Sequence, residues 1–270
     1  MIKRRLTPYY LKKTGLAIAV GAFRYTLLAS LAFMILYPLL FMISNAFFHP
    51  YDLGSAASMW IPPVVTFNNI IVSYIILNYP VALAYTALCT AAVTLLQMLS
   101  SALAGYAFAR MPFKGRSLLF VLVILSIIVP PASYMLPQYV LFQQLHLLQK
   151  PASLFLLAAL GQGLSGGLFI YIFRQFFRGL PKELEEAAYV DGASVPRTFL
   201  GIVLPTAKPA FVTVGVLSFV WNWNDTTMPQ LFNSTQNLLR VKLSSLASPT
   251  GGGGFSSVYQ AINNAFSHSL

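Results

Sequence analysis

Residues Val81 to Ala109, VALAYTALCTAAVTLLQMLSSALAGYAFA, form a long stretch without a single charged side chain, and Arg110 follows directly. The hydrocarbon core of a bilayer is about 30 Å thick and takes about 20 apolar residues of α-helix. Lipid offers no partner for unpaired backbone groups, and the stretch shows no strand-like alternation. It therefore predicts a transmembrane helix in an integral membrane protein.

The composition of the whole chain agrees with this prediction. Hydrophobic residues make up 57% of the 270 residues and charged residues only 9%, against about 25% charged residues in soluble domains. A soluble globule could not cover its surface with so few charges, and a disordered chain would be rich in charge. The single cysteine, Cys89, excludes a disulfide within the chain. His49, His146 and His268 stand too far apart in sequence to supply a ligand-spaced pair, so we expect no metal site.

Four further apolar stretches extend this reading to an all-α polytopic membrane protein with five transmembrane helices. Pro130, Pro131 and Pro137 predict a broken helix end at the outer side of the third span, and Pro205 and Pro209 predict a kink at the entry of the fifth. The segment 49–80 is too interrupted by proline to span and is expected as an outer loop. Besides Val81–Ala109, the expected spans are Tyr25–Phe47, Leu118–Gln138, Ala152–Phe173 and Pro209–Trp221.

The basic residues predict the orientation, because Lys and Arg accumulate on the cytoplasmic side. With the N-terminus in the cytoplasm, all but three of the 17 Lys and Arg residues lie inside, and the exceptions are Lys150, Arg240 and Lys242. The net charge of +11 is then mainly a topology signal, and nucleic-acid binding is not needed to explain it. The long basic region and long apolar core favour an uncleaved first helix over a cleaved signal peptide.

The loop between the fourth and fifth spans, residues 174–208, looks soluble. It holds four of the six acidic residues of the chain: Glu183, Glu185, Glu186 and Asp191. Pro181 suits a first helical position, and the three glutamates then lie near the positive end of the helix dipole. Gly192 can take the left-handed conformation that stops a helix. The loop therefore predicts a short helix and a sharp turn, held against the membrane.

A second short helix is expected after the turn. Ser194 can cap it, Pro196 can enter its first turn, and Pro205 is expected to break it. Phe199, Ile202 and Val203 recur at helical spacing. From the residues alone, a surface helix pair held by its caps and a docking site for another protein remain equally open.

The spacing within this loop is specific. Glu186-Ala187-Ala188, three residues, Gly192, nine residues and then Ile202-Val203-Leu204-Pro205 resembles the EAA motif of ABC importer permeases. The flanking text is similar to the maltose-type second permease of sugar importers, over about Tyr25 to Gly254. The similar stretches are SALAGYAFARMPFKGR (Ser101–Arg116), VPP…LPQY (Val129–Tyr139), RGLPKELEEAAYVDGAS (Arg178–Ser194) and FVWNWND (Phe219–Asp225).

The resemblance implies a mechanism in which this loop is a coupling helix that docks on a cytoplasmic ATPase. Closure of the ATPase pair would rock the membrane helices between inward-facing and outward-facing states. Glu186 would be the polar anchor, Ala187 and Ala188 the surface of close approach, and Gly192 the turn. The full set of expected coupling residues is Glu183, Glu186, Ala187, Ala188, Asp191, Gly192 and Ala193.

The same resemblance implies the partners. They are a second permease subunit, two copies of the ATPase and an extracytoplasmic solute-binding protein, in a bacterial or archaeal cell (inner) membrane. The chain has no GxxxxGK[ST] motif, so it is no ATPase itself, and ATP and Mg would be used by the partner. Import of another solute, such as a polyamine or an amino acid, is the alternative. An integral membrane enzyme fits less well, because the sole acidic cluster lacks a histidine.

Two further groups are candidates for contact with solute or partner. Trp221, Asn222, Trp223 and Asn224 combine stacking surface with amide groups, which suits a sugar path or gate, or else an interfacial belt with a helix-end cap. The four glycines Gly251, Gly252, Gly253 and Gly254 form either a finger that reaches into the binding protein or a flexible linker.

The chain divides into a basic cytoplasmic segment 1–24, a transmembrane domain 25–254 and a C-terminal segment 255–270. No apolar stretch long enough to span follows Trp221, whereas the family that the sequence resembles has six spans. We expect that a sixth helix is missing from this sequence; a protein that works with five is the alternative.

Overall fold

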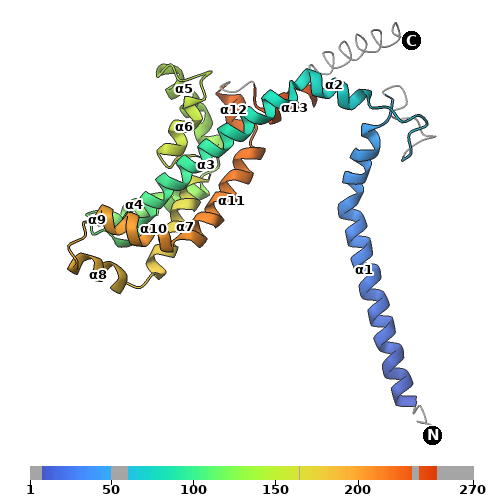
Figure 1. The fold of residues 1–270 in the computed structure, drawn as a ribbon, viewed down its shortest axis with the longest axis horizontal. Coiled ribbons are helices and arrows are strands. Elements are labelled where there is room, and N and C mark those ends of the chain that lie inside the picture. The colour runs from blue at the N-terminus through green and yellow to red at the C-terminus, as the bar shows by residue number, and fades with distance from the viewer. Residues whose placement is uncertain (1–7, 50–59, 164, 233–236, 248–270) are drawn as a thin grey trace. The chain divides into compact units, whose positions relative to one another are not determined.

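A computed structural model describes residues 8–49, 60–163, 165–232 and 237–247, and within these ranges the regular structure is helical throughout. Contacts divide the chain into two compact units that separate between Ile75 and Ile76. Figure 1 gives the order of the helices. The predicted all-helical class is confirmed for the described residues.

The first unit contains one long helix, α1 (Pro8–Ala46). Its apolar part, Leu16–Ala46, is long enough to cross a membrane, and its most apolar window buries nothing within this chain. Trp60 packs edge-on against Tyr37 at a ring-centroid distance of 4.8 Å, and its carbonyl accepts a hydrogen bond from the Ser44 hydroxyl. The helix α2 (Asn68–Leu77) follows. The predicted first span is confirmed as helix, and the helix begins before Tyr25.

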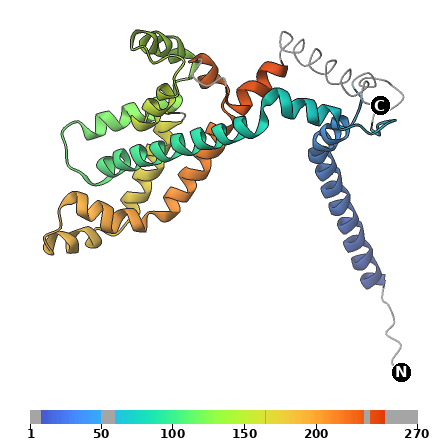
Figure 2. The same ribbon diagram turned by 45° about the horizontal axis from the view of Figure 1, so that its top comes forward.

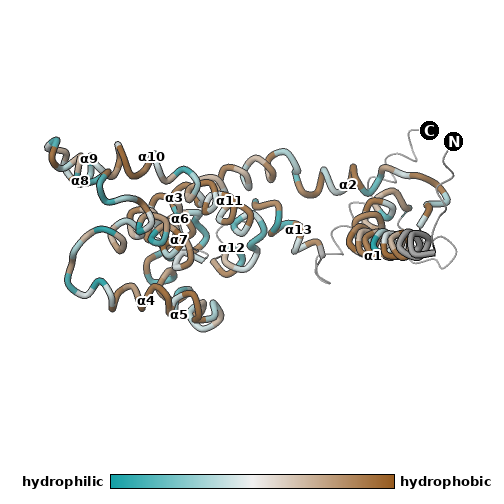
Figure 3. The backbone as a smooth tube through the Cα atoms, turned by 90° about the horizontal axis from the view of Figure 1, so that it is seen from below, coloured by the Kyte–Doolittle hydropathy of each residue, from teal (hydrophilic) through white to brown (hydrophobic). Residues whose placement is uncertain are grey.

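The second unit is built on three mutually packed helices: α3 (Tyr79–Arg110), α7 (Gly166–Gly179) and α11 (Lys208–Asn224). The helix α4 (Arg116–Ile128) packs on α7, and α6 (Ala152–Ala159) packs on α3. The short helices α8 (Glu183–Val190) and α9 (Val195–Thr198) lie at one end of this unit, and α5 (Ala132–Gln144) and α12 (Thr227–Leu231) lie at the opposite end (Figures 1 and 2). Figure 3 shows hydrophobic residues predominating along α1 and α4 and more hydrophilic residues on α8.

The buried core of this unit joins α3, α7 and the segment from α9 to α11. Phe169, Phe173 and Phe177 recur every four residues along α7 and are fully buried. At Gly105 of α3, an added Cβ would lie 2.6 Å from the Phe173 Cβ, so the absence of a side chain lets the two helices pack this closely. This contact fixes α3 against α7.

Three helices end two residues before a proline. Met111, Val129 and Leu180 follow the last residues of α3, α4 and α7, and each has an extended backbone with ψ of 133°, 121° and 143°. A residue before proline disfavours the helical region, because the proline ring collides with its backbone. The sequence therefore sets these boundaries locally.

The third apolar stretch is broken at Pro130 and Pro131 as predicted, but Pro137, which was also expected to break it, lies inside the following helix. The helices α4 and α5 (Ala132–Gln144) meet at 105° across Pro130 and Pro131. The fifth is also bent, by 76° between Val195–Thr206 and α11, at Ala207 between the two prolines. The predicted continuous fourth span, 152–173, is wrong. It consists of α6 and α7, of 8 and 14 residues, interrupted where Gly161 and Ser165 adopt positive φ angles of 71° and 57°.

Among the described residues, two helical segments are long and apolar enough to cross a membrane, namely Leu16–Ala46 and Tyr79–Arg110. Up to four segments qualify if each bent pair counts as one span. The expected number of five is therefore not reached, because the fourth stretch is interrupted by six residues. The remaining helices are α8 (Glu183–Val190), α9 (Val195–Thr198), a π-helical turn (Phe199–Val203), α10 (Leu204–Thr206), α12 (Thr227–Leu231) and α13 (Leu239–Ala247).

Candidate functional site

The helix α8 carries the acidic cluster of the loop. Glu183, Glu185 and Glu186 occupy its first turn, as predicted, where the unpaired backbone N–H groups favour negative charge. Pro181 was predicted at the first helical position, but α8 begins two residues later, at Glu183. The sequence thus placed the helix correctly and its start two residues early.

The turn after α8 depends on Gly192, which has a φ of +80°. Its N–H donates to the Tyr189 carbonyl at 3.0 Å, and the Ala193 N–H donates to the Ala188 carbonyl at 2.9 Å. These bonds satisfy carbonyl groups at the end of the helix that would otherwise have no partner. The predicted left-handed glycine is confirmed.

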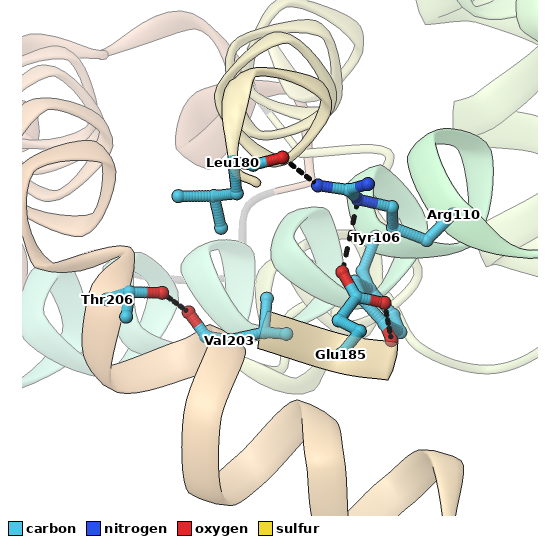
Figure 4. A network of polar contacts seen from close by, with 6 residues as sticks. All are labelled: Tyr106, Arg110, Leu180, Glu185, Val203 and Thr206. Carbon is cyan, nitrogen blue, oxygen red and sulfur yellow. Dashed lines mark hydrogen bonds and ion pairs between the residues drawn. The ribbon is translucent and has the colours of Figure 1, made fainter. Parts of the chain in front are cut away.

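One face of α8 is locked to the end of α3. The Glu185 carboxylate lies 3.1 Å from the Arg110 Nε, and each of the two side chains is 9% exposed. The Tyr106 hydroxyl donates to the other carboxylate oxygen at 3.1 Å, and Arg110 also donates to the Leu180 carbonyl, as Figure 4 shows. Arg110 thereby bridges both sides of the corner between α7 and α8.

The ring of Tyr106 extends this connection into the core. Its centroid lies 5.7 Å from that of Phe177 on α7 and 4.7 Å from that of Phe199 in the π-helical turn. One side chain of α3 therefore contacts α7, α8 and the segment after the Gly192 turn. We call Tyr106, Arg110, Leu180 and Glu185 the latch.

The role of Glu185 was not predicted from the sequence, where Glu186 was expected to be the important residue of the cluster. A signal was available: residues 185 and 188 are three apart and lie on the same side of a helix. In the structure these are the two buried residues of α8. Their common face could have been read as the one that packs inward.

The opposite face of α8 is exposed. It presents Glu183, Glu186 and Ala187, and Val190 is 87% exposed. Asp191 and Gly192 at its end are exposed, and Ala193 is half-buried. Ala188, expected beside Ala187 on the surface of close approach, is instead buried within this chain, with 5% exposure.

The segment after the turn continues as helix beyond its predicted end. Pro205 was expected to break it, but the helical backbone continues through Pro205 to Thr206, and the bend comes at Ala207. Thr206 donates its hydroxyl hydrogen to the Val203 carbonyl at 2.8 Å (Figure 4). Ser194 precedes α9 with an extended backbone, but its side chain does not accept the expected hydrogen bond from a backbone N–H in the first turn of α9.

A second polar group lies deeper in the same unit. The Gln97 Oε1 of α3 accepts hydrogen bonds from the Ser218 hydroxyl at 2.8 Å and from the Asn222 amide at 3.1 Å, both on α11. All three residues are buried. Asn222 therefore points into the helix pair and joins α3 to α11, a partnership that the sequence analysis did not find.

The other predicted gate residues are placed differently. Trp221 stacks on Phe169 at a centroid distance of 5.5 Å, and Trp223 stacks on Phe219 at 5.6 Å. Asn224 is exposed and donates to the carbonyl four residues earlier. The four residues thus do not converge on one site in this structure.

The end of α11 is tied to α12 and α13. The Asp225 carboxylate accepts a hydrogen bond from the Thr227 N–H at 2.9 Å at the start of α12. Arg240 donates to the Trp223 carbonyl at 3.1 Å, and burial lowers the pKa of Arg240 while Asp225 opposes that shift. The predicted glycine finger, Gly251–Gly254, lies outside the described residues.

A cavity of about 710 Å³ opens between α4, α5 and the interruption between α6 and α7. The described residues that line it carry no ionisable carboxylate or basic group. Its polar lining comes from Ser126, Tyr134, Gln138, Gln162 and Ser165. Throughout the described ranges, no cluster of three or more His, Cys, Asp or Glu residues could hold a metal ion.

These features define a helical protein with long apolar helices and an exposed loop helix that a buried ion pair attaches to α3. Residues 101–259 match the family of binding-protein-dependent transport system inner membrane components, and the chain belongs to this family. The resemblance to sugar ABC importer permeases seen in the sequence is confirmed. The chain is a permease, and permeases of this family are transport subunits.

Several relatives share the sequence over different lengths. The osmoprotective compounds uptake permease protein GgtD of Synechocystis sp. is 40% identical over 49% of this chain and 43% of its own length. A putative ABC transporter permease of Caldicellulosiruptor sp. is 31% identical over 70% of this chain and 67% of its own. The arabinooligosaccharides transport system permease protein AraQ of Halalkalibacterium halodurans is 29% identical over 83% of this chain and 80% of its own length. The match to GgtD thus spans less than half of that protein.

A solved structure has the same fold. It is a bacterial ABC transporter involved in the import of the acidic polysaccharide alginate, and the two chains superpose with a TM-score of 0.71 over 88% of this chain and 85% of the other. At 18% identity this likeness concerns the fold alone.

Proposed function

We propose that the chain is one of two permease subunits of an ATP-driven importer and that α8 is the surface on which the partner ATPase acts. The observation that carries this proposal is the contrast between the two faces of α8. One face is fixed to α3 through Glu185, and the other exposes Glu186, Ala187 and Val190. An exposed valine beside small and acidic residues, on a rigid helix, suits contact with another protein.

In this proposal the ATPase supplies the energy and this chain supplies the path. ATP and Mg bind to the ATPase, while this chain binds no cofactor. Closure of two ATPase subunits pushes α8, and the membrane helices of this chain and of a second permease alternate between the two sides. The protein would reside in the inner membrane of a bacterial or archaeal cell, with α8 facing the cytoplasm.

We propose a carbohydrate as the solute. AraQ is named for arabinooligosaccharides, and another relative, 36% identical over 52% of this chain, is the alpha-glucoside transport system permease protein AglG of Rhizobium meliloti. The cavity next to α5 supports a neutral solute, since its polar groups are amides and hydroxyls. A polyamine or an amino acid would lose its hydration there without gaining an opposite charge.

A second candidate is a small osmoprotective compound. It is favoured by the 40% identity to GgtD, which exceeds that to AraQ and AglG. In both cases an extracytoplasmic binding protein would deliver the solute, and Gly251–Gly254 are a candidate contact for it.

The test is uptake by the reconstituted transporter. The chain is co-expressed with a candidate second permease and a candidate ATPase from the same genome, reconstituted into vesicles, and supplied with the candidate binding protein. Labelled maltotriose, arabinotriose, putrescine and glutamine are offered separately, with and without ATP inside. ATP-dependent uptake of either sugar supports the proposal; uptake of putrescine or glutamine alone contradicts the solute class, and ATP-independent uptake contradicts the importer.

A further inference from the structure

We propose that Tyr106, Arg110 and Glu185 are positioning residues of the coupling step, which make α8 and α3 move as one body. This inference rests on the proposed function, in which the ATPase displaces α8. It assigns the transmission of that displacement to a buried ion pair and not to the exposed part of the motif.

First, α8 has few attachments to the rest of the chain besides Glu185. Of its eight residues, only Glu185 and Ala188 are buried, and Ala188 contributes a single methyl group. The segment after the Gly192 turn is held differently, by apolar packing of Phe199 and Val203. Tyr189 of α8 also interacts with Tyr106, so the position of α8 depends mainly on two side chains, Glu185 and Tyr189, that reach the end of α3.

Second, Arg110 contacts both the end of α7 and the side of α8. Its guanidinium contacts the Leu180 carbonyl, just after α7, and the Glu185 carboxylate, within α8. Both ends of the intervening corner are thereby tied to the same side chain of α3. A push on α8 cannot open this corner without separating a buried charge from its partner, which is costly in a low dielectric.

Third, α3 connects the latch to a buried polar cluster further along the same helix. Gln97 belongs to the same uninterrupted helix, about 20 Å from Arg110 at 1.5 Å per residue, and bonds to Ser218 and Asn222 of α11. Movement of α3 therefore reaches the interior of the membrane domain. The direct chain connection from α8 to α11 runs instead through a π-helical turn and a 76° bend, which transmit force less rigidly.

The experiment uses the complete transporter, reconstituted with its ATPase, second permease and binding protein. The variants are Glu185→Gln, Arg110→Gln, their double variant and Tyr106→Phe. The matched control is Lys114→Gln, which removes one exposed positive charge four residues after Arg110. Three quantities are measured: the amount of ATPase that co-purifies, the stimulation of ATP hydrolysis by the binding protein, and amide hydrogen exchange of residues 183–190.

We expect each single Gln variant to keep its ATPase subunits. Exchange in α8 should become about tenfold faster or more, because one buried charge is left unpaired. Stimulation by the binding protein should fall about fivefold or more, the range of a typical coupling free energy. The double variant should recover part of the protection from exchange and part of the stimulation, since two amides can hydrogen-bond to each other and no charge is left unpaired. Tyr106→Phe should lose less of the stimulation than the single Gln variants, and Lys114→Gln should lose none.

Three results would overturn the inference: normal stimulation in both single variants, a loss that only follows reduced assembly, or no recovery in the double variant. None of these results requires the solute class to be right, because solute uptake is not among the three measured quantities. A wild-type complex that shows no stimulated hydrolysis would instead contradict the proposed function itself.

Discussion

Glu185 and Glu186 are neighbours on α8, yet Glu185 is paired with Arg110 at 3.1 Å inside the protein and Glu186 is exposed to its surroundings. Adjacent residues on an α-helix point about 100° apart, so one turn of helix presents one carboxylate inward and the other outward. The EAA-like motif begins at the exposed one. Replacing Glu185 and replacing Glu186 should consequently impair the protein in different ways.

The first prediction compares these two residues. Glu185→Ala removes one partner of a buried ion pair and should destabilise the docked α8 by about 3–5 kcal/mol, because the Arg110 charge is left unpaired. Glu186→Lys reverses an exposed charge and should abolish uptake while thermal stability and membrane level stay near normal. Thermal unfolding of the purified complex and vesicle uptake would be measured on both. Equal stability of the two variants would contradict the assignment of inner and outer faces.

The second prediction concerns Gly192. Its φ of +80° is accessible to asparagine at small cost but not to proline, whose ring fixes φ near −65°. Gly192→Pro should abolish uptake at a normal membrane level, whereas Gly192→Asn should retain most of it. The measurement is uptake normalised to the amount of protein in the membrane. Full activity of the proline variant would show that the left-handed turn is dispensable.

Most of the helices, and some of their ends, could be predicted from local sequence, because these features depend on residues close together in the chain. The prolines after Met111, Val129 and Leu180 stop helices by steric collision, and Gly192 supplies a conformation that other residues avoid. The interruption between α6 and α7 was missed, because the stretch 152–173 is apolar and long enough to be one span. The positive φ angles at Gly161 and Ser165, which interrupt the helix, leave no periodic pattern in the sequence.

The latch could not be predicted from one sequence. Tyr106 and Arg110 lie at the end of a stretch that reads as an ordinary transmembrane helix, where a terminal arginine is expected from topology alone. Its pairing with Glu185 joins residues far apart in the chain and depends on α3 packing against α7. The same holds for Gln97 and Asn222, because buried polar residues on two helices reveal their partnership only once the helices are placed.

The third prediction tests the Gln97 cluster. Asn222→Leu leaves the Gln97 carbonyl oxygen with one fewer donor in a buried site and should cost about 1–3 kcal/mol of stability. Adding Gln97→Met, which removes the oxygen that has lost a donor, should restore part of that loss. The measurement is thermal unfolding of the detergent-purified complex. Strictly additive losses would indicate that the two side chains do not interact.

The fourth prediction concerns topology. In a Cys89→Ser background, Leu184→Cys next to Glu185 should resist a membrane-impermeant thiol reagent in intact cells and react after the cells are opened. Lys150→Cys, exposed between α5 and α6 and expected outside, is the matched control and should react in intact cells. Both positions are exposed, so accessibility within the protein does not limit the reaction. Labelling of position 184 from outside would refute the proposed orientation.

The last prediction tests the contact that sets α3 against α7. Gly105→Ala would place a methyl group 2.6 Å from the Phe173 Cβ and 3.0 Å from the Arg174 backbone nitrogen. The helices would have to separate, at a cost of about 1–3 kcal/mol for overpacking. Because Tyr106 follows directly and Arg110 lies on the same helix, the separation should also loosen the latch. Gly179→Ala at the end of α7 is the control, since nothing lies within 4 Å of its added Cβ. We expect lower thermal stability and faster exchange in α8 for the Gly105 variant alone; an unchanged Gly105 variant would mean that α3 and α7 are not packed as closely in the membrane as in this structure.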